Sequence, residues 1–246
     1  MAGRAPRPRL RGLARGAGLA AGLWLAGALA SAAQDIAAAA YDAPTTRYAH
    51  GVLGDAIEHG ALVLTLTDGR RSRIVLPETR VFEDTAPRLA DLDGDGGPEV
   101  IVVESDLSRG ARLAVYDADG LVAATPFIGQ RNRWLAPLGV ADLDGDGAME
   151  IAYVDRPHLA RVLRVWRFAE GTLRAVAAAP GHTNHRIGER HISGGLRDCG
   201  AGPEIVTATP AWTGLLATRL RKGVLESRAI APAAGAAEFA AALACR

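Results

Sequence analysis

Apolar and polar residues alternate in short runs along most of the chain, and turn residues separate these runs. Clear examples are Val100–Val103, Ala111–Tyr116 and Leu121–Thr125, and similar runs occur at Ile151–Val154 and Val162–Phe168. Short apolar or alternating runs between turns are typical of β-strands. No segment from 41 to 230 keeps a helical period over three turns, so the pattern predicts an all-β fold.

The pattern repeats about every 51 residues. The heptapeptide A-D-L-D-G-D-G occurs at Ala90–Gly96 and again at Ala141–Gly147. Four turn glycines lie between paired apolar runs, at positions 69, 120, 171 and 223. Glycine suits a tight turn because it adopts positive φ at low cost. We expect four repeat units, at about 41–84, 85–134, 135–186 and 187–231, followed by an Ala-rich tail at 232–246.

Each unit has the order strand, acidic loop, strand, link, strand, glycine turn, strand. Four antiparallel strands in 40–50 residues are typical of a propeller blade, and stacked blades bury one another's faces. Residues 34–246 are therefore expected to form a β-propeller of about four four-stranded blades. An open or irregular array of the same repeats is the alternative.

The two acidic loops place carboxylates at positions 1, 3, 5 and 9, with a backbone carbonyl at position 7. The oxygen-bearing residues are Asp91, Asp93, Asp95, Gly97 and Glu99 in the first loop, and Asp142, Asp144, Asp146, Ala148 and Glu150 in the second. Calcium takes six to eight oxygen ligands, so we expect two Ca²⁺ sites. An EF-hand is excluded because it requires flanking helices and a glutamate at position 12, where Val102 and Tyr153 stand.

The motif D-x-D-x-D-G-x-x-E between strands, repeated at about 50 residues, resembles the FG-GAP/VCBS repeat family. The resemblance spans about 41–230 and is strongest over 86–177. It implies the calcium-binding blades found in integrin-type propellers and in many exported bacterial proteins. The third loop, Gly195–Glu204, keeps Asp198 and Glu204 but has Leu196 and Gly200 at positions 1 and 5, so no calcium is expected there.

The N-terminus reads as a secretory signal peptide over residues 1–33. A basic start precedes the apolar run Gly16–Ala30, and small residues suit cleavage after Ala32 or Ala33. The run has 15 residues, fewer than the ~20 that span a bilayer; a retained membrane anchor is the alternative. No later segment is long and apolar enough to span a membrane. We expect a periplasmic or secreted protein.

Removal of five arginines with the signal changes the net charge from +1 to −4. A mildly acidic chain lacks the basic footprint of nucleic-acid binding, so no nucleic-acid partner is expected. The two cysteines, Cys199 and Cys245, suggest a disulfide in an exported protein, with two separate thiols as the alternative.

No catalytic motif is evident: the sequence has no G-x-S-x-G, no phosphate-binding glycine loop and no metalloprotease histidine pair. We therefore expect a non-catalytic calcium-binding repeat protein that binds an unknown protein or glycan. The alternative is a hydrolase or lyase with its site at the axial mouth of a propeller. Two further groups have structural as well as functional interpretations. They are a zinc site at His182, His185, His191 and Glu189, and a sugar-binding surface at Trp134, Trp166 and Trp212.

Overall fold

The computed structural model describes residues 1–3 and 35–246. The expected signal peptide, residues 1–33, lies outside the described residues except for its first three. Within the described ranges, no helix is both long enough and apolar enough to cross a membrane.

The fold is all-β, as the alternating pattern predicts, with sixteen strands and one short helix in the described residues. The strands are β1 (Ile36–Thr45), β2 (Glu58–Leu66), β3 (Arg71–Val75), β4 (Arg80–Phe82), β5 (Arg88–Ala90), β6 (Glu99–Asp106), β7 (Gly110–Tyr116), β8 (Leu121–Ala124), β9 (Leu135–Ala141), β10 (Glu150–Asp155), β11 (Val162–Ala169), β12 (Thr172–Pro180), β13 (Gly195–Asp198), β14 (Pro203–Ala208), β15 (Leu215–Arg221) and β16 (Val224–Ala231). The helix is α1 (Ala236–Leu243). The turn glycines 69, 120, 171 and 223 all have positive φ, between 66° and 139°, as tight turns require.

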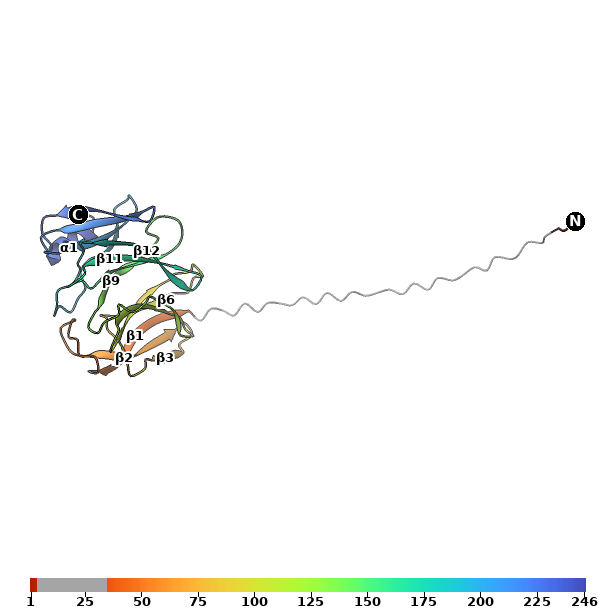
Figure 1. The fold of residues 1–246 in the computed structure, drawn as a ribbon, viewed down its shortest axis with the longest axis horizontal. Coiled ribbons are helices and arrows are strands. Elements are labelled where there is room, and N and C mark those ends of the chain that lie inside the picture. Colours follow the sequence, from red (N-terminus) through yellow and green to blue (C-terminus); the bar gives the residue numbers. More distant parts are fainter. Residues whose placement is uncertain (4–34) are drawn as a thin grey trace. The chain divides into compact units, whose positions relative to one another are not determined.

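The strands form three antiparallel sheets that follow one another in sequence order (Figure 1). Strands β9–β12 and β13–β16 make one four-stranded sheet each, and β1–β8 make a single eight-stranded sheet. The short strand β4 joins the first two units, because Phe82 pairs with His59 of β2 and with Glu104 of β6. Within residues 35–246 the pairing contains no closed barrel or propeller.

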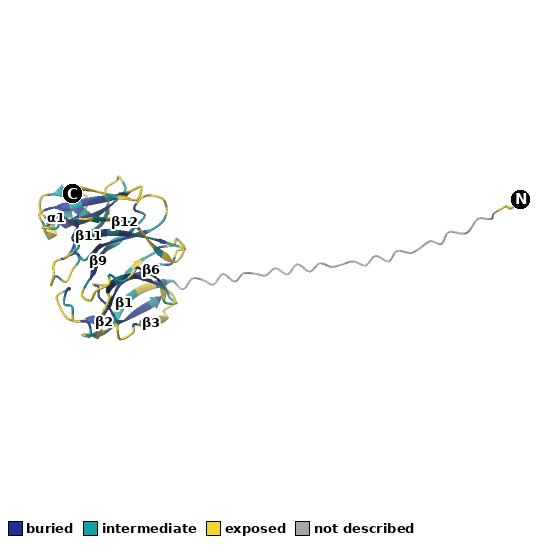
Figure 2. Cartoon of the chain, viewed as in Figure 1, coloured by how far each residue is buried: buried dark blue, intermediate teal, exposed yellow. Residues whose placement is uncertain are grey.

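The core consists of apolar layers between successive units. In Figure 2 the buried residues, in dark blue, lie mainly in the strands. Strand β6 is buried along its whole length. Its Val100 and Val102 pack toward the first unit, and Ile101 and Val103 pack toward the third. This division follows from the pleat, which directs successive side chains to opposite faces. Each unit thus depends on its neighbours for burial.

The C-terminal tail closes the last layer. Helix α1 packs Phe239 and Ala242 against the sheet residues Val206 and Leu215. A disulfide joins Cys199 to Cys245 with their Cα atoms 5.6 Å apart, which confirms the predicted bridge. The bridge ties the third loop to the end of the helix.

Candidate functional site

The two acidic loops occupy equivalent places in neighbouring sheets. The first loop connects β5 to β6, and the second connects β9 to β10. In each loop the residue before the first aspartate pairs with the closing glutamate: Ala90 with Glu99, and Ala141 with Glu150. The glycine at position 6, Gly96 or Gly147, has a φ near 90° that other residues rarely adopt. The sequence repeat therefore gives two hairpin loops of one design.

Backbone amides hold the carboxylates of both loops in place. Asp91 accepts hydrogen bonds from the amides of Gly94 at 2.7 Å and Gly96 at 3.1 Å. Glu99 reaches back to accept the amide of Leu92 at 2.8 Å. The second loop repeats these bonds, with Asp142 accepting from Gly145 and Gly147, and Glu150 from Leu143. These hydrogen bonds from the loop backbone thus fix the positions of the carboxylate oxygens.

The first loop gathers negative charge without a basic partner. Single carboxylate oxygens of Asp91, Asp93 and Glu99 all lie within 4.8 Å of one another. Burial raises the pKa of Glu99, and the charges of Asp93 and Asp95 raise it further. Within residues 35–246, no basic side chain forms an ion pair with these four acids. This arrangement favours a cation.

The second loop gathers oxygens in the same way but already contains a cation. Oxygens of Asp142, Asp144 and Asp146 lie within 4.8 Å of one another. The guanidinium of Arg167 contacts Asp144 at 3.0 Å, Asp146 at 2.7 Å and Glu150 at 2.6 Å.

Arg167 lies on β11 directly opposite Glu150. Burial raises the pKa of Glu150, whereas the amide of Leu143 and the Arg167 guanidinium lower it. In the first sheet Val100 pairs with Tyr116. The next residue, Asp117, therefore occupies the position that corresponds to Arg167 in the second sheet. The sequence repeat alone did not reveal this difference between the loops.

The third loop is neutralised by arginines. The buried carboxylate of Glu204 pairs with Arg197 at 2.7 Å, and with Arg219 and Arg228 at 2.8 Å each. Burial alone would raise the pKa of Glu204, but hydrogen bonds from Arg197 and Arg228 hold it below its usual value. Asp198 accepts the amides of Gly200 and Gly202 within its own turn. Guanidinium groups thus surround the glutamate that would close a metal loop.

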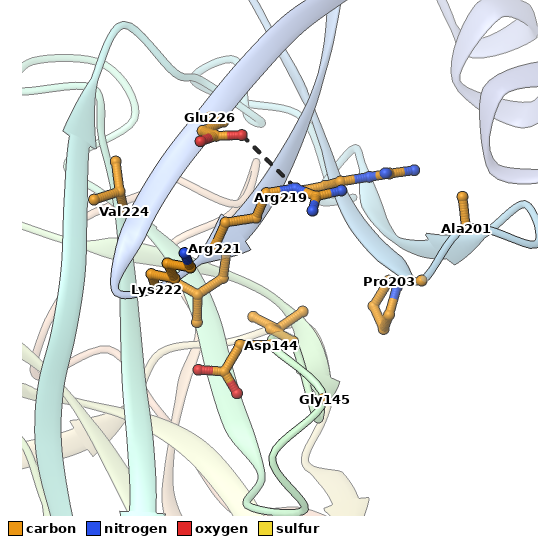
Figure 3. Close-up of a pocket in the computed structure, with 12 residues that line it drawn as sticks. Asp144, Gly145, Ala201, Pro203, Arg219, Arg221, Lys222, Val224 and Glu226 are labelled. Atoms are coloured by element: carbon orange, nitrogen blue, oxygen red, sulfur yellow. Dashed lines mark ion pairs between the residues drawn. The ribbon is translucent and has the colours of Figure 1, made fainter.

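A hollow of about 680 Å³ lies between the second acidic loop and the β15–β16 turn (Figure 3). Asp144 and Gly145 line one side, and Arg221, Lys222 and Glu226 line the other. Arg221 and Glu226 pair across 3.7 Å. Because the hollow shares Asp144 with the loop, we treat it as the surroundings of that loop.

The three histidines of the zinc interpretation do not converge. His182 bonds Thr207 at 2.8 Å, and His185 bonds His158 at 3.0 Å. His191 lies 3.8 Å from Glu189. In the described part of the chain, no group of three converging metal-ligand side chains contains a histidine.

The tryptophans of the sugar-binding interpretation have structural contacts. Trp134 is 2% exposed, and its indole donates to the carbonyl of Glu83 at 2.8 Å. The indole of Trp166 donates to the hydroxyl of Tyr153 at 3.0 Å. Trp212 packs edge-on against Phe239 of α1.

Comparison with known proteins supports the repeat that was identified in the sequence. Residues 91–153, which include both acidic loops, match the model of the FG-GAP-like repeat. Among solved structures, the crystal structure of the exotype rhamnogalacturonan lyase YesX matches with a TM-score of 0.46 and 16% identity. The match covers 81% of this chain and 48% of that one, so the chain spans about half the length of that structure. No curated protein matches the chain.

Proposed function

We propose that this protein is a non-catalytic, calcium-binding repeat protein of the periplasm or cell exterior, which acts as a binding or scaffold module for a protein or glycan. Its repeats would stack as propeller-type blades in an open array. The observation that carries the proposal is the first acidic loop, whose carboxylates converge without a basic partner in the described residues. The disulfide supports an oxidising compartment.

Calcium is the cation that the donor set fits best. All the donors are oxygens, and calcium tolerates six to eight of them in flexible geometry. In the first loop Asp91, Asp93, Asp95 and Glu99 would hold the ion, with the carbonyl of Gly97 as a further donor. In the second loop Asp142, Asp144, Asp146 and Glu150 would hold it with the carbonyl of Ala148.

The two sites would differ in affinity because Arg167 lies among the ligands of the second loop. Calcium would have to displace this guanidinium, whereas the first loop needs no such exchange. We therefore expect the first loop to fill at lower calcium concentration.

The role of the ions would be structural. Each ion would neutralise like-charged side chains that repel at close range. A ligand that binds only the folded state adds about 2.7 kcal/mol of stability at a hundredfold excess over its Kd. Calcium would thus stabilise one hairpin in each of two neighbouring sheets.

Calorimetric titration of the mature protein tests the proposal. We expect two unequal calcium sites, and Asp93→Asn and Asp144→Asn should each remove one. Asp119→Asn is the matched control, because Asp119 is an acidic residue in the β7–β8 turn outside both loops. A melting temperature indifferent to chelator, together with no bound calcium, would overturn the proposal.

A further inference from the structure

A cavity of about 330 Å³ lies away from both acidic loops. It is formed by the segment after β1, the segment before β9, the loop after β10 and the link before β13. The lining residues are His50, Val52, Asn132, Arg133, Trp134, Arg156, Pro157, His158, Leu159 and Ile187. Leu135 pairs with Asp155 at this end of β9 and β10, whereas the second acidic loop joins their other ends, roughly 20 Å along the strands.

The charge of the lining selects for an anion. In the described residues, two arginines, two histidines and no acidic residue line the cavity. Burial lowers the pKa of His158 to about 4, so this histidine is neutral and the positive charge comes from the arginines. Arg156 is neutralised by Asp155, with contacts of 2.8 and 3.1 Å. The guanidinium of Arg133 has no ion-pair partner among residues 35–246. Arg133 is therefore the lining arginine whose charge is not paired within residues 35–246.

A buried carboxylate fixes His50 in the wall. Its Nδ1 lies 2.5 Å from a carboxylate oxygen of Glu83, whose side chain is fully buried. The hydroxyl of Ser105 donates to the other oxygen of that carboxylate. When the carboxyl group of Glu83 donates to Nδ1, the ring carries its proton on Nε2 and can donate it to a ligand. Burial, which raises the pKa of Glu83, favours this arrangement.

The other half of the cavity is apolar. Val52, Trp134 and Pro157 form its buried surface. Leu159 and Ile187 stand at the rim with 61% and 72% of their surface exposed. Large apolar side chains exposed beside a concave, partly polar site are typical of a ligand-binding surface.

We propose that this cavity binds a small organic carboxylate with an apolar ring or chain. Arg133 and the Nε2 of His50 hold the carboxylate, since a guanidinium matches its two oxygens. Leu159 and Ile187 cover the apolar part. The inference names a ligand class for the binding role proposed above and rests on that role, but it uses none of the calcium ligands.

Titration of the full mature protein with benzoate tests this inference. We expect saturable binding with a Kd on the order of 1 mM, as its few heavy atoms allow. Arg133→Gln should weaken binding about tenfold or more, because a charge-assisted contact is lost. Leu159→Ser should weaken it severalfold with little effect on folding, since this side chain is exposed.

Two probes and one variant serve as controls. Benzamide keeps the ring without the charge, and inorganic phosphate keeps a charge without the ring; both should bind more weakly than benzoate. Arg131→Gln removes the same charge two residues away, from a guanidinium over the ring of Tyr48, and should leave benzoate binding unchanged.

Several outcomes would overturn the inference: no benzoate binding, equal binding of benzamide or phosphate, or full binding by Arg133→Gln. Calcium titration of the same samples separates this failure from that of the proposed function. Two calcium sites without benzoate binding would reject the cavity alone. Benzoate binding without any calcium would reject the calcium sites and retain the cavity.

Discussion

Arg167→Gln removes the guanidinium that bridges three carboxylates of the second acidic loop. The strongest contact is with Glu150, whose side chain is fully buried, whereas that of Arg167 is 25% exposed. Hydrogen bonds to charged groups contribute about 1.5–3 kcal/mol, and solvent screening lowers this for a partly exposed partner. Without calcium, we expect the variant to lose about 1–2 kcal/mol of stability.

The same change should strengthen calcium binding at the second loop. In the variant the ion no longer has to displace a guanidinium, so the 1–2 kcal/mol of stability that the variant loses without calcium is added to its calcium-binding free energy. The calcium affinity of this loop should therefore rise about 5- to 30-fold. The assay is calorimetric titration together with melting curves in chelator and in excess calcium. The variant should melt below the unchanged protein in chelator, and calcium should close this gap.

Arg164→Gln is the matched control, because Arg164 lies on the same strand and pairs with Asp155 at 2.8 Å, away from the loop. We expect it to lower stability equally with and without calcium, and to leave calcium affinity unchanged. The reasoning is refuted if Arg167→Gln binds calcium no more tightly than the unchanged protein, or if Arg164→Gln gains affinity as well.

Further predictions concern groups outside the two expected calcium sites. Burial, followed by the charge of Glu83, raises the pKa of Glu58 to about 9. The folded protein therefore keeps a proton that the unfolded chain releases above about pH 5, and stability falls as pH rises to about 9, by up to ~1.4 kcal/mol per pH unit. Glu58→Gln should flatten this slope in melting curves from pH 5 to 9. Cys245→Ser opens a bridge between residues 46 apart and should cost about 2–4 kcal/mol in denaturant unfolding. Glu204→Gln leaves three arginines without their shared carboxylate and should cost about 3 kcal/mol, whereas Asp198→Ala should not change calcium stoichiometry.

Each of these has an outcome that contradicts it. A melting temperature of Glu58→Gln that falls with pH as steeply as before would mean that Glu58 is charged in the folded state. Equal unfolding midpoints for Cys245→Ser and the unchanged protein would show that the bridge adds no stability. Loss of a calcium site in Asp198→Ala would show that the third loop binds an ion.

The fold could be predicted where the signal is local. Alternating runs located the strands β6, β7, β8, β10 and β11, and the repeated glycines located the turns, because both depend on neighbouring residues. Strand β4 was missed because Arg80–Phe82 is too short to show a period. It forms only through pairing with β2 and β6, which are distant in sequence.

The candidate site likewise has residues that a local sequence pattern reveals and residues that only the fold brings together. The acidic loops could be identified because their donors lie within nine residues of one another. Arg167 could not, since its role depends on the register that places it opposite Glu150. The cavity residues His50 and Arg133 come from different units, and Glu83, which contacts His50, is 33 residues away from it in the sequence, so no local pattern relates them.

The joining of two units through β4 has a mechanical consequence. A chain pulled from its ends gives way sheet by sheet, and the lengths released report which strands are bonded together. Here β1–β8 share one hydrogen-bonded sheet, while β9–β12 and β13–β16 form their own. The Cys199–Cys245 bridge closes residues 199–245 into a loop, so the bridge must first be reduced for β13–β16 to extend. In the reduced protein the force trace should therefore show three steps and not four, with the step from β1–β8 releasing about twice the contour length of either other step.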